Sequence, residues 1–259
     1  MMLEWLVPYL LWISLSLLLA SALTRRSQVA ALGWSLFAFF WLGQIGHYLN
    51  IEDYFNVVLF LATGLLCFYM SWIMIDRGFS SRACYWASYA ASACGLIYFP
   101  FAEIQSLQDG LIGFTTFVTA KILQVLSVPV TLDSWNIMSL NGRSVEIILA
   151  CTAIESIALF AGVILSVEAP IGRKLKALAA STLSIYVLNI VRNGFVIMAY
   201  GWSWFGEESF EIAHNLIAKL GSTVALLAIS YVVFLLLPEL LSIIDELAAE
   251  VKPKRGGTA

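Results

Sequence analysis

The sequence predicts an all-α polytopic integral membrane protein with about seven transmembrane helices. Of its 259 residues, 61% are hydrophobic and only 12% are charged, whereas a soluble domain contains about 25% charged residues. The mean hydropathy is +0.88. A helix needs about 20 apolar residues to cross the hydrocarbon core, and it satisfies its own backbone hydrogen bonds there. Long apolar stretches therefore predict spanning helices, and the short alternating segments typical of an outer-membrane barrel are not found.

Seven apolar stretches are long enough to be spans. They cover residues 6–23, 29–48, 55–75, 83–101, 145–167, 177–200 and 215–237. The first has Glu4 before it and Arg25 and Arg26 after it. A cleavable signal peptide has its positive charge before the apolar run, so we expect this stretch to be retained as the first helix.

The charges of the connecting segments predict the orientation. Alternate connections carry a basic set, comprising Arg25, Arg26, Arg77, Arg82, Arg173, Lys174, Lys176, Lys252, Lys254 and Arg255. The opposite connections carry an acidic set, comprising Glu52, Asp53, Glu103, Asp109, Asp133, Glu207, Glu208 and Glu211. Lysine and arginine are enriched in cytoplasmic loops. We therefore expect the N-terminus outside and the C-terminus in the cytoplasm of a multi-pass cell-membrane protein.

This pattern divides the chain into four parts. Residues 1–101 form an N-terminal four-helix membrane part, 102–142 an outer loop, 143–237 a three-helix core and 238–259 a cytoplasmic tail. The outer loop contains an apolar run, 111–130, that is interrupted by Lys121; we interpret it as an interfacial helix or a re-entrant element. An eighth span there would place Arg173, Lys174 and Lys176 outside, against the charge rule.

Charge and cysteine usage exclude several classes of function. The net charge of −3 and pI of about 5.4 argue against nucleic-acid binding and a polybasic membrane-surface protein. The four cysteines lie in apolar segments, without a CxxC or a Cys/His cluster of zinc spacing: Cys67, Cys84, Cys94 and Cys151. We expect no disulfide framework, no metal site and no cofactor.

One stretch, residues 144–162, places reactive groups at membrane depth. Cys151 and Glu155 are four residues apart, so a helix would stack them on one face. An ionisable group inside a membrane is costly and usually marks a functional site. A buried free cysteine alone is most often a packing residue, so further groups are needed to indicate chemistry.

Two such groups lie in the last two predicted spans. At 1.5 Å per residue, Cys151 is roughly 9 Å and Arg192 roughly 12 Å inside the outer ends of their spans, and His214 is at the outer mouth of the last. A thiolate is a nucleophile whose pKa falls beside a cation. Histidine can move its proton, and an arginine can stabilise an oxyanion. These three residues therefore suggest a nucleophilic site facing the outer leaflet.

Several neighbouring side chains are expected to support this site. Glu155 would form an ion pair with Arg192 and orient it. Amides within one turn of Arg192 would add polar contacts inside the bundle; they are Asn189 and Asn193. Arg143 and Glu146, at the outer mouth of the fifth span, would bind substrate, although a solvated interfacial position explains them equally well.

At these residues the chain resembles the exosortase/archaeosortase family of membrane transpeptidases, and within it the archaeosortase A group. The resemblance covers roughly residues 143–221 and rests on three motifs: ACTAIES around Cys151, LNIVRN around Arg192 and AHNLIAKLG around His214. The family's Cys, Arg and His fall on these three residues. Family members often have glycine two residues after the cysteine, where this chain has Ala153.

The resemblance implies a substrate and a reaction. The partners would be exported proteins with a C-terminal signal made of a Pro-Gly-Phe motif, a hydrophobic helix and a basic tail. Cys151 would cleave this signal and hold the protein as a thioester, and an amine or hydroxyl of a membrane lipid would resolve the thioester.

Two other functions fit the same residues. The first is an intramembrane cysteine protease, in which water resolves the acyl-enzyme. The second is a seven-helix transporter or receptor in which Glu155 and Arg192 form a gate or ligand site. Lys219 lies about one turn from the outer end of its predicted span, which does not favour a buried retinal Schiff base.

Overall fold

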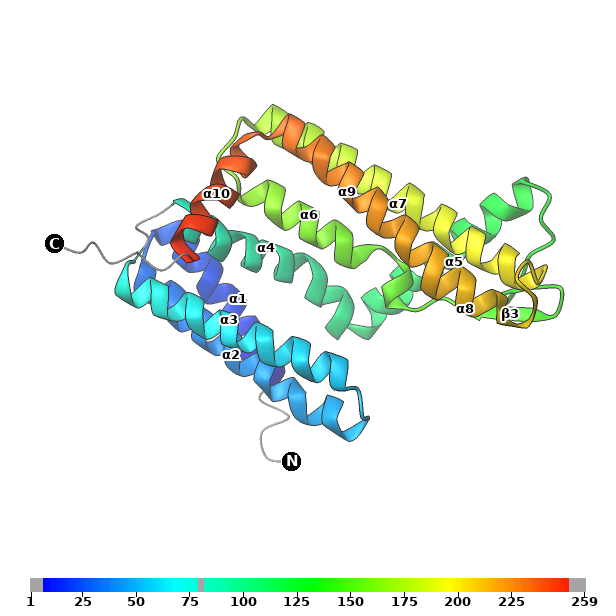
Figure 1. The fold of residues 1–259 in the computed structure, drawn as a ribbon, viewed down its shortest axis with the longest axis horizontal. Helices are drawn as coiled ribbons and strands as arrows, with labels where there is room; N and C mark the ends of the chain where they lie inside the picture. The colour runs from blue at the N-terminus through cyan, green and yellow to red at the C-terminus, as the bar shows by residue number, and fades with distance from the viewer. Residues whose placement is uncertain (1–6, 79–81, 252–259) are drawn as a thin grey trace. The chain divides into compact units, whose positions relative to one another are not determined.

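The computed structural model describes residues 7–78 and 82–251. The predicted tail residues Lys252, Lys254 and Arg255, like Glu4 before the first span, lie outside the described residues. The described chain is mostly helical, as the sequence predicts, with one small sheet (Figure 1). It forms two compact units, one made of Met1–Leu96, Leu165–Glu168 and Glu239–Ala259, the other of Ile97–Ile164 and Ala169–Pro238.

The first unit consists of long apolar helices. They are α1 (Val7–Thr24), α2 (Ser27–Asn50), α3 (Tyr54–Asp76), most of α4 (Arg82–Glu103) and the shorter α10 (Glu239–Val251). Few polar groups link them. The Trp34 indole donates to the Ser88 hydroxyl over 2.9 Å, and the Ser71 hydroxyl donates to the Ala31 carbonyl over 2.8 Å. The unit is thus held together mainly by apolar packing, as expected for helices in a membrane.

Four helices of the described chain are long and apolar enough to cross a membrane. They are Ser27–Asn50, Tyr54–Asp76, Ile171–Gly201 and Gly206–Leu236. Two apolar helices are shorter, Tyr9–Thr24 and Ile154–Ser166. The 13 residues of the latter extend about 20 Å at 1.5 Å per residue, less than the ~30 Å hydrocarbon core. The chain is therefore a multi-pass membrane protein, and the count of seven spans stays a prediction.

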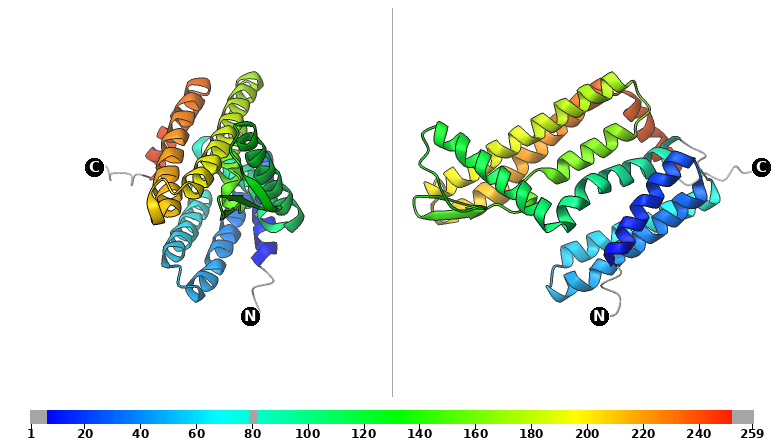
Figure 2. Two further views of the ribbon diagram at one scale, coloured as in Figure 1. Left: turned by 90° about the vertical axis from the view of Figure 1, so that its right-hand side faces the viewer. Right: turned by 180° about the vertical axis from the view of Figure 1, so that it is seen from behind.

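The second unit carries all the predicted site residues. It contains α5 (Gln105–Val125), β1 (Thr131–Ser134), β2 (Ile137–Leu140), β3 (Arg143–Glu146), η2 (Leu149–Cys151), α6 (Ile154–Ser166) and α7 (Ile171–Gly201). A last helical run follows, made of η3 (Gly206–Glu208), α8 (Ser209–Glu211), the π-helix η4 (Ile212–Ala218) and α9 (Lys219–Leu236). Both α7 and α9 are long and lie side by side, and the sheet lies at the C-terminal end of α7 (Figures 1 and 2).

The sheet corrects the prediction that this unit is all helical. The apolar run of the outer loop does form a helix, α5, but residues 131–146 form three antiparallel strands in the order β1-β2-β3. Strands β2 and β3 are joined by Asn141 and Gly142, with φ angles of 53° and 76°. Two successive residues with positive φ are the mark of a tight hairpin turn, for which Asn-Gly is the preferred sequence.

The hairpin is fixed to the end of α7 by three contacts. Arg143 donates from Nη1 to the Tyr200 carbonyl over 3.0 Å, and the Asn141 amide donates to the Gly201 carbonyl over 3.2 Å. The last carbonyls of a helix have no partner within it, and a cation is favourable there. Leu140 packs so closely on Gly201 that a Cβ at Gly201 would lie 2.6 Å from Leu140 Cγ. The sheet is therefore a C-terminal cap of α7.

Because Leu140 packs so closely on Gly201, we expect a larger residue at position 201 to destabilise the protein. We expect Gly201→Ala to lower the free energy of unfolding by about 1–3 kcal/mol, because the added methyl group overpacks against Leu140. Gly172→Ala, at the other end of α7, is the control, since a Cβ there meets no atom within 4 Å. Thermal unfolding of the two purified proteins in detergent measures the difference; equal midpoints would contradict close packing at Gly201.

Candidate active site

Cys151 lies before a helix and not within one, which corrects the predicted span 145–167. Strand β3 ends at Glu146, Cys151 closes the short 3-10 turn η2, and α6 begins only at Ile154. Between them Ala153 has a φ of 67°, a left-handed conformation that interrupts a right-handed helix. Cys151 and Glu155 are therefore not stacked on one helical face, and Glu155 lies in the first turn of α6.

Two amide side chains of α7 hold the backbone of Cys151. Nδ2 of Asn189 donates to the Cys151 carbonyl over 2.7 Å, and Nδ2 of Asn193 donates to the same oxygen over 2.9 Å. The two asparagines are one turn apart and so share a face of α7; both are buried. A buried carbonyl outside a helix needs such donors. The asparagines thus fix the Cys151 turn against α7.

The thiol itself is largely buried. Cys151 is 8% exposed, and it belongs to an apolar cluster with Leu123 of α5, Met138 and Leu140 of β2, and Ile197 of α7. The neighbours of Cys151 in the turn, Ala150 and Ala153, line a cavity instead. The turn therefore lies between an apolar core and an open cavity.

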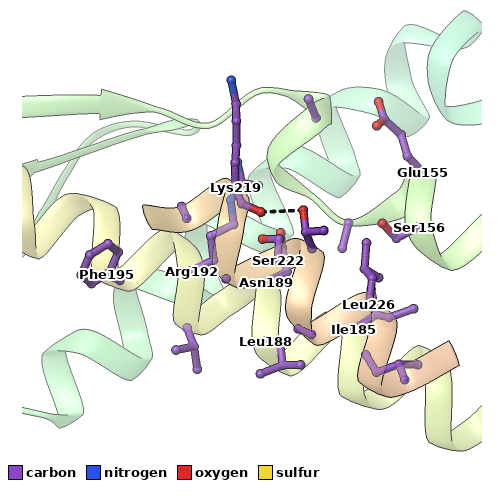
Figure 3. A pocket seen from close by; sticks show the side chains of 18 of the residues that line it. Glu155, Ser156, Ile185, Leu188, Asn189, Arg192, Phe195, Lys219, Ser222 and Leu226 are labelled. Atoms are coloured by element: carbon purple, nitrogen blue, oxygen red, sulfur yellow. Dashed lines mark hydrogen bonds between the residues drawn. The ribbon is translucent and has the colours of Figure 1, made fainter. Parts of the chain in front are cut away.

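The cavity has a volume of about 670 Å³ and is bounded by the start of α6, by α7 and by the last helical run (Figure 3). Its walls are mainly apolar. The polar side chains that line it are Glu155, Ser156, Asn189, Arg192, Lys219, Ser222 and Thr223. An apolar cavity with a few polar groups is the usual form of a ligand site.

Arg192 of α7 lines this cavity. Among the residues that the structure describes, no ion pair joins it to Glu155, and its buried Nε has no hydrogen-bond partner. Figure 3 shows Glu155 on the opposite side of the cavity from Arg192. The expected ion pair between Glu155 and Arg192 is thus not formed. Glu155 lies in the first turn of α6, on the far side of the cavity from Arg192 (Figure 3). The exposed Glu155 carboxylate instead has a favourable position in the first turn of α6.

His214 lies within the last helical run, which starts at Gly206 and not at residue 215 as predicted. It is part of the π-helix η4, a form that often marks functional sites. Its ring stacks on Phe210, with centroids 5.2 Å apart and an angle of 5° between the planes. The π-helix packs against α7, which carries Arg192, although His214 itself is not among the described residues that line the cavity. The structure therefore brings His214 and Arg192 to one region.

Arg143 and Glu146 are not among the described residues that line the cavity. Arg143 caps α7 as described above, and its guanidinium also lies over the Tyr200 ring, 5.0 Å from the centroid. Glu146 accepts a hydrogen bond from the Asn136 amide over 3.0 Å. The contacts of both residues are structural, and a role in substrate binding stays a prediction.

No metal centre is found in the described part of the chain, which contains no group of three or more His, Cys, Asp or Glu side chains placed to hold an ion.

The shared carbonyl predicts that the two asparagines act together. Asn189→Leu or Asn193→Leu leaves one donor on the Cys151 oxygen, whereas the double variant leaves a buried acceptor unsatisfied, which costs about 1–3 kcal/mol. We expect the double variant to lose more stability than the sum of the single losses, and Cys151 to react faster with a thiol reagent. Thermal unfolding and maleimide labelling test this; strictly additive losses would contradict a shared role.

The conformation of Ala153 gives a second prediction. Glycine adopts a positive φ without strain, so Ala153→Gly should raise the free energy of unfolding by about 0.5–1 kcal/mol. Ala158→Gly, at a fully buried position in the middle of α6, should lower it by about 1 kcal/mol. Chemical denaturation of both variants provides the comparison, and a loss of stability in both would show that the turn at Ala153 is not strained.

The chain is similar to known membrane proteins over most of its length. The family model described as Transmembrane exosortase (Exosortase_EpsH) matches residues 3–239. Archaeosortase A of Haloferax volcanii is 30% identical to this chain, and the alignment covers 86% of this chain and 84% of that protein. Archaeosortase A of Natronomonas pharaonis is 28% identical, and the alignment covers 95% of this chain and 90% of that protein. No solved structure matches the chain. The match over nearly the whole sequence shows that the chain belongs to the transmembrane exosortase family.

Proposed function

We propose that the chain is a membrane cysteine transpeptidase that cleaves the C-terminal sorting signal of exported proteins and transfers them to a membrane lipid. Its similarity to archaeosortases supports a sortase-like, cysteine-dependent processing function. One observation about the site carries the proposal: two asparagines of α7 hold the Cys151 turn, and Ala150 and Ala153 of that turn line the same cavity as Arg192.

The first chemical step would form a thioester on Cys151. The turn directly precedes the N-terminus of α6, where the helix dipole favours an anion, and two of its residues line the cavity together with Arg192. The thiol proton passes to His214, and the sulfur attacks the carbonyl carbon of the scissile peptide bond. Arg192 stabilises the resulting oxyanion. The C–N bond then breaks, and His214 returns the proton to the leaving amine.

In the second step an amine or hydroxyl of a lipid headgroup attacks the thioester carbon. Its proton passes to the sulfur by way of His214 as the C–S bond breaks, which restores the thiol. If water attacks instead, the same intermediate gives a free carboxylate, and the enzyme is a protease. The mass of the new C-terminus distinguishes the two reactions: an added lipid supports transfer, and one added water per cleaved bond supports hydrolysis.

The structure is compatible with an outer-leaflet site in a seven-span protein, although α6 is short. Asn189 and Asn193 are 12 and 8 residues before Gly201, or roughly 12–18 Å along α7. Their bonds to Cys151 place the turn at that depth below the sheet. The non-helical segment before α6 and the ~20 Å of α6 together would cover the hydrocarbon core. Such a segment is tolerated there because protein donors satisfy its backbone.

The expected substrate has the tripartite signal described above, with a Pro-Gly-Phe motif, a hydrophobic helix and a basic tail. Leu188, Leu226 and Ile229 give the cavity an apolar wall along α7 and α9. Such a wall suits a substrate helix or lipid chains that arrive laterally from the membrane. The partners are thus proposed to be an exported protein and a membrane lipid.

The proposal predicts a strict need for the Cys151 thiol. In cells that express a substrate with the tripartite signal, Cys151→Ala should abolish processing, whereas Cys94→Ala, which changes a thiol of the other unit, should leave it intact. Immunoblotting for the unprocessed and processed forms gives the result. Processing by Cys151→Ala at the wild-type rate would exclude Cys151 as the nucleophile.

The guanidinium of Arg192 gives a separate prediction. Lysine keeps the charge but not the planar set of donors, so Arg192→Lys should reduce the processing rate at least tenfold while the protein stays folded. The control is Arg173→Lys, on α7 but distant from the cavity-lining stretch. A rate within twofold of the wild type for Arg192→Lys would indicate that only charge matters at this position.

A further inference from the structure

A second cation, Lys219, lines the same cavity as Arg192. It is the first residue of α9 and directly follows the π-helix that carries His214. Figure 3 shows its side chain extending away from the α9 ribbon. In the described part of the chain no carboxylate forms an ion pair with Lys219. A cation at the wall of a largely apolar cavity, without a protein counter-charge, is suited to an anionic ligand.

Three neighbouring features restrict the kind of anion. The Ser222 hydroxyl lies one turn after Lys219, lines the cavity and has no hydrogen-bond partner among the described residues. Thr223 also lines it, but its hydroxyl donates to the Lys219 carbonyl over 2.9 Å. Farther along α7 and α9 the lining is apolar, with Ile185, Leu226 and Ile229. The cavity thus offers a cation and a hydroxyl next to an apolar wall, which matches an anionic headgroup attached to hydrocarbon chains.

We propose that Lys219 and Ser222 bind the phosphate of the phospholipid that accepts the protein from Cys151. This inference rests on the proposed transpeptidation. Phosphate accepts charge-assisted hydrogen bonds from lysine and further bonds from a hydroxyl. Lys219 lies five residues after His214 on the same helical run, so a phosphate held there places the headgroup's terminal amine or hydroxyl near the base that takes its proton.

In the transfer step, the headgroup nitrogen or oxygen forms a bond to the thioester carbon, and the C–S bond breaks. The proton leaves the headgroup for His214 and reaches the Cys151 sulfur, so that an amide or ester of the lipid and a free thiol remain. Holding the phosphate would favour this nucleophile over water by raising its local concentration at the thioester. Lys219 is thus proposed as a residue that selects the acceptor.

Lipid retention by the purified full-length protein tests this inference without any substrate protein. Native mass spectrometry would compare phosphatidylethanolamine with a galactolipid of the same chains, which lacks phosphate. We expect the wild type to retain the phospholipid at least fivefold better than the galactolipid, Lys219→Gln to lose this preference, and Lys219→Arg to keep it. Lys121→Gln, which changes an exposed lysine of α5, is the matched control and should behave as the wild type.

Two results would overturn the inference. One is an unchanged phospholipid preference in Lys219→Gln, which would show that the cation acts elsewhere. The other is equal competition by soluble glycerophosphoethanolamine, which would show a site for free phosphate and not for a lipid. Since Cys151 takes no part in lipid retention, a failure here is distinct from a failure of the proposed chemistry, which the Cys151→Ala processing assay tests.

Discussion

Two hydrogen bonds from α7 to one carbonyl determine the geometry of the proposed site. The Cys151 turn is not α-helical, and a buried backbone carbonyl without a donor would cost several kcal/mol. Asn189 and Asn193 remove that cost, since both amides donate to the Cys151 oxygen. Arg192 lies between them in the sequence and lines the adjoining cavity. The same helix therefore holds the backbone of the proposed nucleophile and supplies a cation to the cavity that adjoins its turn.

The sheet serves the same arrangement from the end of α7. Arg143 and Asn141 bond to its last carbonyls, and Leu140 packs on Gly201. The chain leaves β3 at this fixed end and enters the turn a few residues later. On the other side of the cavity, the π-helix η4 carries His214. A sheet cap and an asparagine pair thus fix the ends of the segment that carries Cys151 on α7, and Ile217 and Ala218 of the irregular helix line the same cavity as Arg192.

Periodicity and composition predicted the helical membrane architecture, and the Cys, Arg and His motifs predicted the family. The hairpin is not predicted although Asn141-Gly142 is a strong turn signal, because residues 102–142 are interpreted as an outer loop. The positive φ of Ala153, which interrupts the predicted helix, could not be predicted from this sequence, because alanine rarely adopts that conformation. The π-helix η4 and the positions of Glu155 and Arg192, which form no ion pair within the described residues, depend on tertiary packing. Local sequence patterns do not predict that packing.

In the proposed reaction, Cys151 carries the substrate as a thioester between cleavage and transfer. The most direct test of this step is peptide mass spectrometry of the enzyme stopped by acid during turnover. The account predicts a substrate-derived acyl group on the peptide that contains Cys151, lost on treatment with hydroxylamine and lost in the presence of acceptor lipid. An active enzyme that carries the acyl group on another residue, or a stable adduct that acceptor lipid does not discharge, would contradict it.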